Sequence, residues 1–189
     1  MVVAQSWRRF LMEWEAMKHY HMPYALIIDL TFRNPLIEHM LPALLHVKAL
    51  AVLDEALKAY ILDHKLQMPK QSHKTLAGRI RFLADSKVLE NGPALCAAVK
   101  RRNEVAHELR ASLGWDALSA DVDAVEAALK RLGYVGSRPK MEYFGERSGF
   151  EGSNEPGVLG IRQFRIGVKE EGSPVYEASW EQKLHGAGG

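Results

Sequence analysis

Residues 95–114 read LCAAVKRRNEVAHELRASLG, and their apolar side chains recur at the three- and four-residue spacing of an amphipathic α-helix. The apolar positions are Leu95, Val99, Ala106, Leu109 and Leu113. Arg102 stands at the centre of this stripe, where the spacing expects an aliphatic residue. A buried charge is costly unless something satisfies it, so we expect Arg102 to have an anionic partner.

Two helices are expected before this stretch. Residues 4–21 carry aromatic and aliphatic side chains at helical spacing, and Pro23 is expected to end that helix. The pair Asn34–Pro35 is a favourable helix start, and the following helix is expected to reach about residue 66. Pro42 is a point at which this second helix kinks or restarts.

Two shorter helices flank the central stretch. Residues 74–87 predict a helix with Arg79 on an outer face, and residues 115–132 predict another that Gly133 ends. Gly114 is expected to close the helix that carries Arg102. Residues 1–133 are therefore interpreted as one helical bundle.

The composition changes after the last of these helices. Residues 134–160 are rich in Gly, Ser, Pro and charge, which is typical of a linker. Residues 161–189 contain two alternating apolar and polar runs around Glu171–Ser173, the pattern of a β-hairpin followed by a tail. The chain is thus predicted to be mainly α, an up-and-down bundle of about five helices with a C-terminal β-hairpin appendage.

Positive charge is concentrated in the middle of the chain. Residues 65–111 hold ten Lys and Arg against four acids, although the whole chain has a formal net charge of only +2. This distribution is compatible with an anionic partner such as nucleic acid, and equally with a solvated basic face.

Cysteine use and hydropathy indicate the compartment. Cys96 is the only cysteine, which excludes an intrachain disulfide and favours a reducing environment. The longest apolar run, 24–30, contains Asp29 and is too short to span a bilayer, and the first residues lack the pattern of a signal peptide. We expect a cytoplasmic protein with no membrane partner, no metal site and no cofactor.

The segment Arg102–His107 combines a guanidinium, an amide and an imidazole on one helix. Such a set can hold a phosphodiester and move a proton beside it. The alternative is structural: Arg102 pairs with a buried acid such as Asp54 or Glu55, and His107 caps a helix end. The same spacing at Arg33 and His39 is interpreted as structural, because Asn34–Pro35 already forms a helix start there.

Arg102-Asn103-x-x-Ala106-His107, within a bundle of this order, resembles the motif of the HEPN domain superfamily. The resemblance covers about residues 5–132. It implies a compact helical bundle and metal-independent endoribonuclease activity, with a composite active site in a homodimer. It also implies a toxin or defence role with an antitoxin or regulatory partner protein.

The resemblance assigns the site residues. His107 is the general acid or base at the ribose 2′-hydroxyl or the leaving oxygen, Arg102 holds the scissile phosphate, and Asn103 supports them. The neighbouring cations expected to bind RNA phosphates are Lys100, Arg101 and Arg110. Two alternatives stay open: a non-catalytic HEPN module that binds RNA, a nucleotide or a protein, and a helix-turn-helix regulator of duplex DNA.

Overall fold

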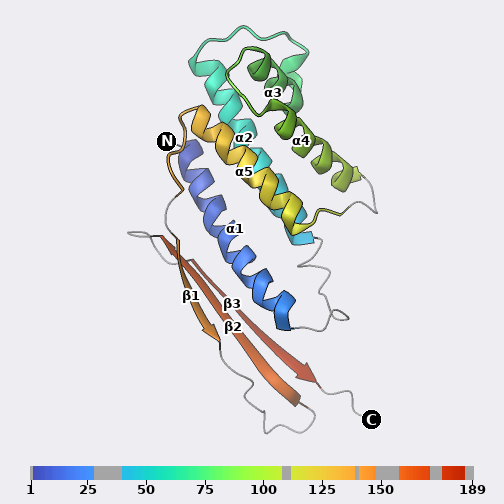
Figure 1. Cartoon of the computed structure of the whole chain (residues 1–189), viewed down its shortest axis with the longest axis vertical. Helices are drawn as coiled ribbons and strands as arrows, with labels where there is room; N and C mark the ends of the chain where they lie inside the picture. Colours follow the sequence, from blue (N-terminus) through green and yellow to red (C-terminus); the bar gives the residue numbers. More distant parts are fainter. Residues whose placement is uncertain are drawn as a thin grey trace. The chain divides into compact units, whose positions relative to one another are not determined.

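The computed structural model describes residues 2–27, 40–107, 112–138, 141–147, 158–170 and 176–185. Within these ranges the protein is mainly helical, as predicted, and contains five α-helices and three strands (Figure 1). The helices are α1 (Val2–Ile27), α2 (Leu41–Asp63), α3 (Leu76–Asp85), α4 (Gly92–His107) and α5 (Trp115–Arg131). A 3-10 turn, η3 (Ser72–Lys74), precedes α3.

The chain divides into two compact units. The first unit comprises Met1–Leu11 and Ile28–Ser137, and the second comprises Met12–Ile27 and Arg138–Gly189. α1 therefore contributes its first part to one unit and its remainder to the other. The candidate functional residues all belong to the first unit.

α2 contacts α3, α4 and α5 in the first unit. Its side chains Leu50, Leu53 and Leu57 are fully buried, as are Leu118 and Leu129 of α5. Each such burial stabilises the fold by about 2 kcal/mol. Because this face of α2 is buried, polar residues of the helix such as Asp54 lie on its other faces.

α1 is longer than the sequence predicts. It continues four residues beyond Pro23 to Ile27, so the prediction that Pro23 ends the helix is wrong. Proline removes its own amide donor, but residues after it still donate to carbonyls one turn back, so a helix can continue with a kink. At the start of the helix the ring centroids of Trp7 and Phe10 lie 4.9 Å apart in a stacked pair.

α2 begins at Leu41 with Pro42 in its first turn, a position where the missing amide costs little. The residues that would distinguish a kink at Pro42 from a restart there, 28–39, lie outside the described residues. The predicted start at Asn34–Pro35 and the Arg33–His39 spacing lie outside the described residues.

The helix that carries Arg102 is described as far as His107, whereas the predicted apolar stripe extends to Leu113. α4 runs to His107, and residues 108–111 are outside the described ranges. Leu113 is buried but precedes α5, and Gly114 is the N-cap of α5, so the prediction that Gly114 closes the α4 helix is wrong. Gly133, with φ +79°, follows the end of α5 as predicted.

The second unit contains an antiparallel three-stranded sheet in the order β1-β2-β3. Its strands are β1 (Met141–Arg147), β2 (Val158–Glu170) and β3 (Tyr176–His185). Phe164 pairs with Trp180 across β2 and β3, and the register shifts at Val158/Gly160. β1 lies inside the range 134–160 that the sequence presents as a linker.

A search of the described helices for a segment long and apolar enough to cross a membrane finds none.

Candidate functional site

A groove of about 510 Å³ lies between α2, η3–α3 and α4, and we call it the Arg102 groove. Arg102 and Asn103 of α4 form part of its lining. The apolar part of its lining consists of Val47, Leu50, Ala51, Leu76, Ala77 and Val99. The polar part adds Asp54, Lys74, Thr75 and Arg79. An apolar lining with a few charged groups is the usual composition of a ligand site.

Arg102 is half-buried rather than enclosed in the core. Its Nε and Nη2 donate to Oδ1 of Asn103, at 3.2 and 2.8 Å. Among the described residues no carboxylate pairs with Arg102, so pairing with Asp54 or Glu55 does not occur. An amide oxygen orients the guanidinium without neutralising it, which leaves a full positive charge at the groove.

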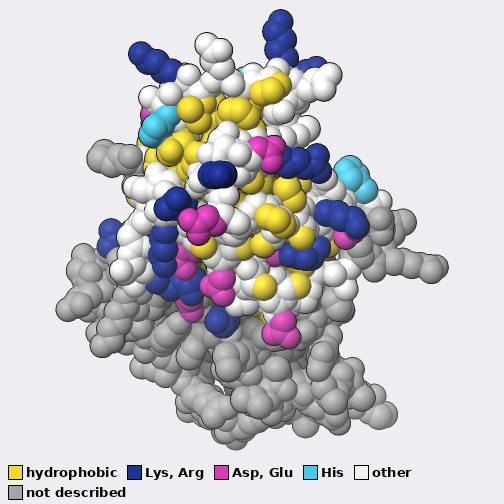
Figure 2. Space-filling model, turned by 45° about the horizontal axis from the view of Figure 1, so that its top comes forward, with side chains coloured by type: hydrophobic (Ala, Val, Ile, Leu, Met, Phe, Trp, Pro, Cys, Tyr) yellow, Lys and Arg dark blue, Asp and Glu magenta, His cyan; other side chains and the backbone are white. Residues whose placement is uncertain are grey.

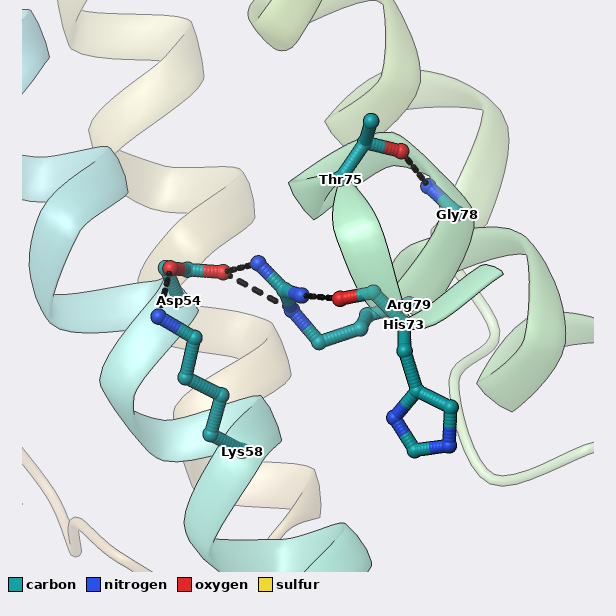
Figure 3. Close-up of polar contacts among 6 residues, drawn as sticks. All are labelled: Asp54, Lys58, His73, Thr75, Gly78 and Arg79. Carbon is teal, nitrogen blue, oxygen red and sulfur yellow. Dashed lines mark hydrogen bonds and ion pairs between the residues drawn. The ribbon is translucent and has the colours of Figure 1, made fainter. Parts of the chain in front are cut away.

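Asp54 instead pairs with Arg79 and Lys58 (Figure 3). Nε of Arg79 donates to Oδ1 of Asp54 at 2.9 Å, and Nη1 donates to the backbone carbonyl of His73. Arg79 is only 6% exposed, so the prediction that it lies on an outer face is wrong. Its position follows from spacing, since it lies three residues after Leu76 and four before Leu83 on the buried face of α3.

Arg101, the neighbour of Arg102, points to a different partner. Its guanidinium donates to both carboxylate oxygens of Asp121 on α5, with Nε at 3.0 Å from Oδ2. Nε2 of the buried His46 on α2 lies 3.0 Å from the same Oδ2, although the pair is not aligned as a hydrogen bond. The three side chains join α2, α4 and α5.

The charge of Asp121 is stabilised by these neighbours. Burial alone raises the pKa of the Asp121 carboxyl, but the contacts to His46 and Arg101 outweigh it and hold the pKa below its ordinary value. The same contact raises the pKa of Arg101. Arg101 therefore connects α4 to α5 through Asp121, with 38% of its side chain exposed.

The remaining predicted site residues lie apart from the Arg102 groove. His107 is the last residue of α4, is exposed, and is not part of the groove lining. Lys100 is 79% exposed, and its Nζ lies 3.5 Å from Oε1 of Glu104. Arg110 is outside the described residues. The structure therefore brings Arg102 and Asn103 together and leaves His107 on the surface of the same helix.

Sequence reasoning missed His46 and Asp121, as well as the contribution of Lys74 and Arg79 to the groove. A usable signal for Asp121 existed, because it falls on the apolar stripe of its helix beside Leu118 and Val125, where only a paired acid is tolerated. The pairing itself depends on three helices and is not visible in the sequence of any one of them.

A comparison of the chain with protein-family models, with curated proteins and with solved structures finds no match.

Proposed function

We propose that the chain is a cytoplasmic, metal-independent endoribonuclease of the HEPN type. One observation carries the proposal: of the two arginines that line the Arg102 groove, only Arg102 has no carboxylate partner among the described residues. Arg79 pairs with the half-buried Asp54, and Arg101, outside the groove, pairs with the buried Asp121, whereas Arg102 donates to the amide oxygen of Asn103. Such a guanidinium is suited to an anion that arrives from solvent, such as a phosphodiester.

The reaction follows from the chemistry of the two side chains. His107 takes the proton of a ribose 2′-hydroxyl, and the oxygen attacks the adjacent phosphorus. The bond from phosphorus to the 5′-oxygen breaks, and the leaving oxygen takes a proton from water while His107 returns its own proton to the solvent, which gives a 2′,3′-cyclic phosphate and a 5′-hydroxyl. Arg102 stabilises the negative charge that develops on the phosphoryl oxygens.

The proposed site uses two copies of the chain. Positions 102 and 107 lie about 140° apart around a helix at 100° per residue, so one helix does not direct both side chains at one atom. In a homodimer, Arg102 of one chain and His107 of the other can face the same phosphate across a two-fold axis. A nuclease of this kind would be restrained in the cell by a partner protein, as in toxin and defence systems.

Cleavage of a labelled single-stranded RNA in EDTA tests the proposal. We expect activity from the wild type and a loss of at least about a hundredfold in both Arg102→Ala and His107→Ala. His64→Ala is the matched control, because His64 is also an exposed histidine at the end of a helix. Equal cleavage by the wild type and His107→Ala contradicts the proposal.

A non-catalytic RNA-binding module is the second candidate. It is favoured by the position of His107, which does not line the groove that Arg102 and Asn103 line. This candidate predicts RNA binding that depends on Arg102 and no cleavage in the assay above. The structure favours a helix-turn-helix regulator of DNA less than these two candidates. Residues 86–91 separate α3 from α4, and this link is longer than the usual turn of about 3–4 residues.

A further inference from the structure

A second pocket adjoins the Arg102 groove. It has a volume of about 600 Å³, lies between the last turns of α2 and the segment before α3, and we call it the Lys65 pocket. Lys58, Lys65 and His73 line it together with the apolar Ile61, Leu62 and Leu66. Arg79 lines both the pocket and the groove, so the two hollows share this residue as a common wall.

The lining of the two hollows is strongly positive. Among the described residues that line them, five are Lys or Arg and one is an acid. The cations are Lys58, Lys65, Lys74, Arg79 and Arg102. The acid, Asp54, is shared by Arg79 and Lys58, so it leaves the lining with a net positive charge (Figure 3).

Apolar side chains accompany these cations along the whole length. Leu62 is 76% exposed and Val47 is 49% exposed, at opposite ends of the two hollows. Figure 2 shows hydrophobic side chains gathered between Lys and Arg side chains on the end of the helical part that comes forward in that view. Positive charge beside apolar surface is the composition of sites that bind single strands, where phosphates meet cations and bases rest on apolar groups.

We infer that the Arg102 groove and the Lys65 pocket form one track for single-stranded RNA, which leads from Arg102 past Arg79 to Lys65. The inference deepens the proposed function and rests on it for the choice of RNA. Val47 and Leu62 are fifteen residues apart on α2, or about 22 Å along its axis. At about 3.4 Å per stacked nucleotide, the track accommodates about six nucleotides.

Binding to an uncleaved RNA tests the track. The chain of residues 1–189 carrying His107→Ala is titrated with fluorescent oligouridine RNAs of about 3, 6 and 12 nucleotides, and binding is followed by anisotropy. We expect the affinity to rise steeply from about 3 to about 6 nucleotides and little beyond. Equal affinity for the shortest and longest RNA would overturn the inference.

Substitutions locate the RNA on the surface. Added to His107→Ala, Lys65→Gln and Lys74→Gln are each expected to weaken binding about fivefold at about 0.1 M salt and to lower the salt slope by about 0.7. Lys87→Gln is the matched control, because Lys87 and Lys65 are both exposed lysines with positive φ (58° and 50°), and Lys87 lines neither hollow. Equal losses in all three variants, or effective competition by polyglutamate, would overturn the track.

The binding experiments and the cleavage assay can fail independently of each other. If Lys65→Gln weakens binding but the wild type does not cut RNA, the track stands and the nuclease proposal fails. If the wild type cuts RNA and neither Lys65→Gln nor Lys74→Gln changes binding, the nuclease proposal stands and the track fails.

Discussion

Two consecutive arginines on α4 have the same chemistry and opposite surroundings. Arg101 meets the buried carboxylate of Asp121, and Arg102 meets the amide of Asn103 at the edge of a groove. One position along a helix turns a side chain by about 100°, which separates the two guanidiniums onto different faces. Asp121 therefore occupies the guanidinium of Arg101, while the guanidinium of Arg102 remains available to an anion.

The Asp121 carboxylate makes a measurable contribution to stability. Asp121→Asn keeps the size of the side chain but removes the carboxylate charge that the guanidinium of Arg101 contacts. We expect the free energy of unfolding to fall by about 3 kcal/mol, measured by urea denaturation at neutral pH. The exposed Asp85→Asn should change it by less than about 0.5 kcal/mol. A fall no larger than that of the control contradicts this role.

The same carboxylate predicts a pH dependence. The pKa of Asp121 is lower in the folded chain than its ordinary value of 3.8, so the unfolded chain takes up the proton first as the pH falls. Its contribution is therefore complete above about pH 5 and is lost progressively as the pH falls through the ordinary value and then the lowered pKa. We expect the stability difference between the wild type and Asp121→Asn to narrow between about pH 5 and about pH 2. A constant difference over this range would show that the charge of Asp121 is not responsible.

The start of α3 lies close against the backbone of η3. Oγ1 of Thr75 accepts a hydrogen bond from the amide of Gly78 at 3.0 Å and caps α3 (Figure 3). A Cβ atom on Gly78 would lie 2.6 Å from the backbone oxygen of Ser72 and 2.9 Å from its Cα. Glycine is required here by the close approach of two backbone segments.

Gly78→Ala is therefore expected to destabilise the protein. Alanine favours a helix by about 1 kcal/mol over glycine, but the clash with the Ser72 backbone forces η3 to shift, and we expect a net loss of about 1–3 kcal/mol in the free energy of unfolding. Gly136→Ala is the control, since a Cβ there meets nothing within 4 Å. Equal or greater stability of Gly78→Ala in thermal and urea unfolding contradicts this packing argument.

The spacing of apolar residues predicted where the helices lie. The preferences of single residue types were a poorer guide to where a helix ends and which side chains it buries. The helical repeat of apolar residues, together with the turn residues between the helices, predicted most of the boundaries of α3, α4 and α5 to within a few residues. The expectations at Pro23 and Arg79 were wrong because each rested on the average preference of one residue type. For Arg79, the spacing of α3 already indicated the buried face, and Asp54 on another helix made the burial tolerable.

The candidate site was predictable only in part for a related reason. The motif pointed to Arg102 and Asn103, which do lie together at a groove. The sequence did not reveal that Asp54 belongs to Arg79 and Asp121 to Arg101, because each pair joins residues at least twenty positions apart. Those long-range pairs decide which arginine is left without a carboxylate partner.

At the scale of the whole molecule, a site shared between two chains makes activity depend on concentration. If Arg102 and His107 of different chains serve one phosphate, only dimers cut RNA. Below the dissociation constant of the dimer, a tenfold dilution should lower the rate per chain about tenfold. A rate per chain that stays constant down to concentrations where sedimentation shows only monomer contradicts the shared site.

Mixing inactive chains gives the sharper version of this prediction. A dimer of one Arg102→Ala chain and one His107→Ala chain keeps one intact pair, because the arginine comes from the second chain and the histidine from the first. With random pairing, half of the dimers are mixed and each has one of two sites, so we expect about a quarter of the wild-type activity. Replacing the Arg102→Ala chain with one that carries both substitutions removes every intact pair and should abolish the recovery. If instead each chain uses its own arginine and histidine, neither mixture cuts RNA, and the two-chain arrangement is wrong.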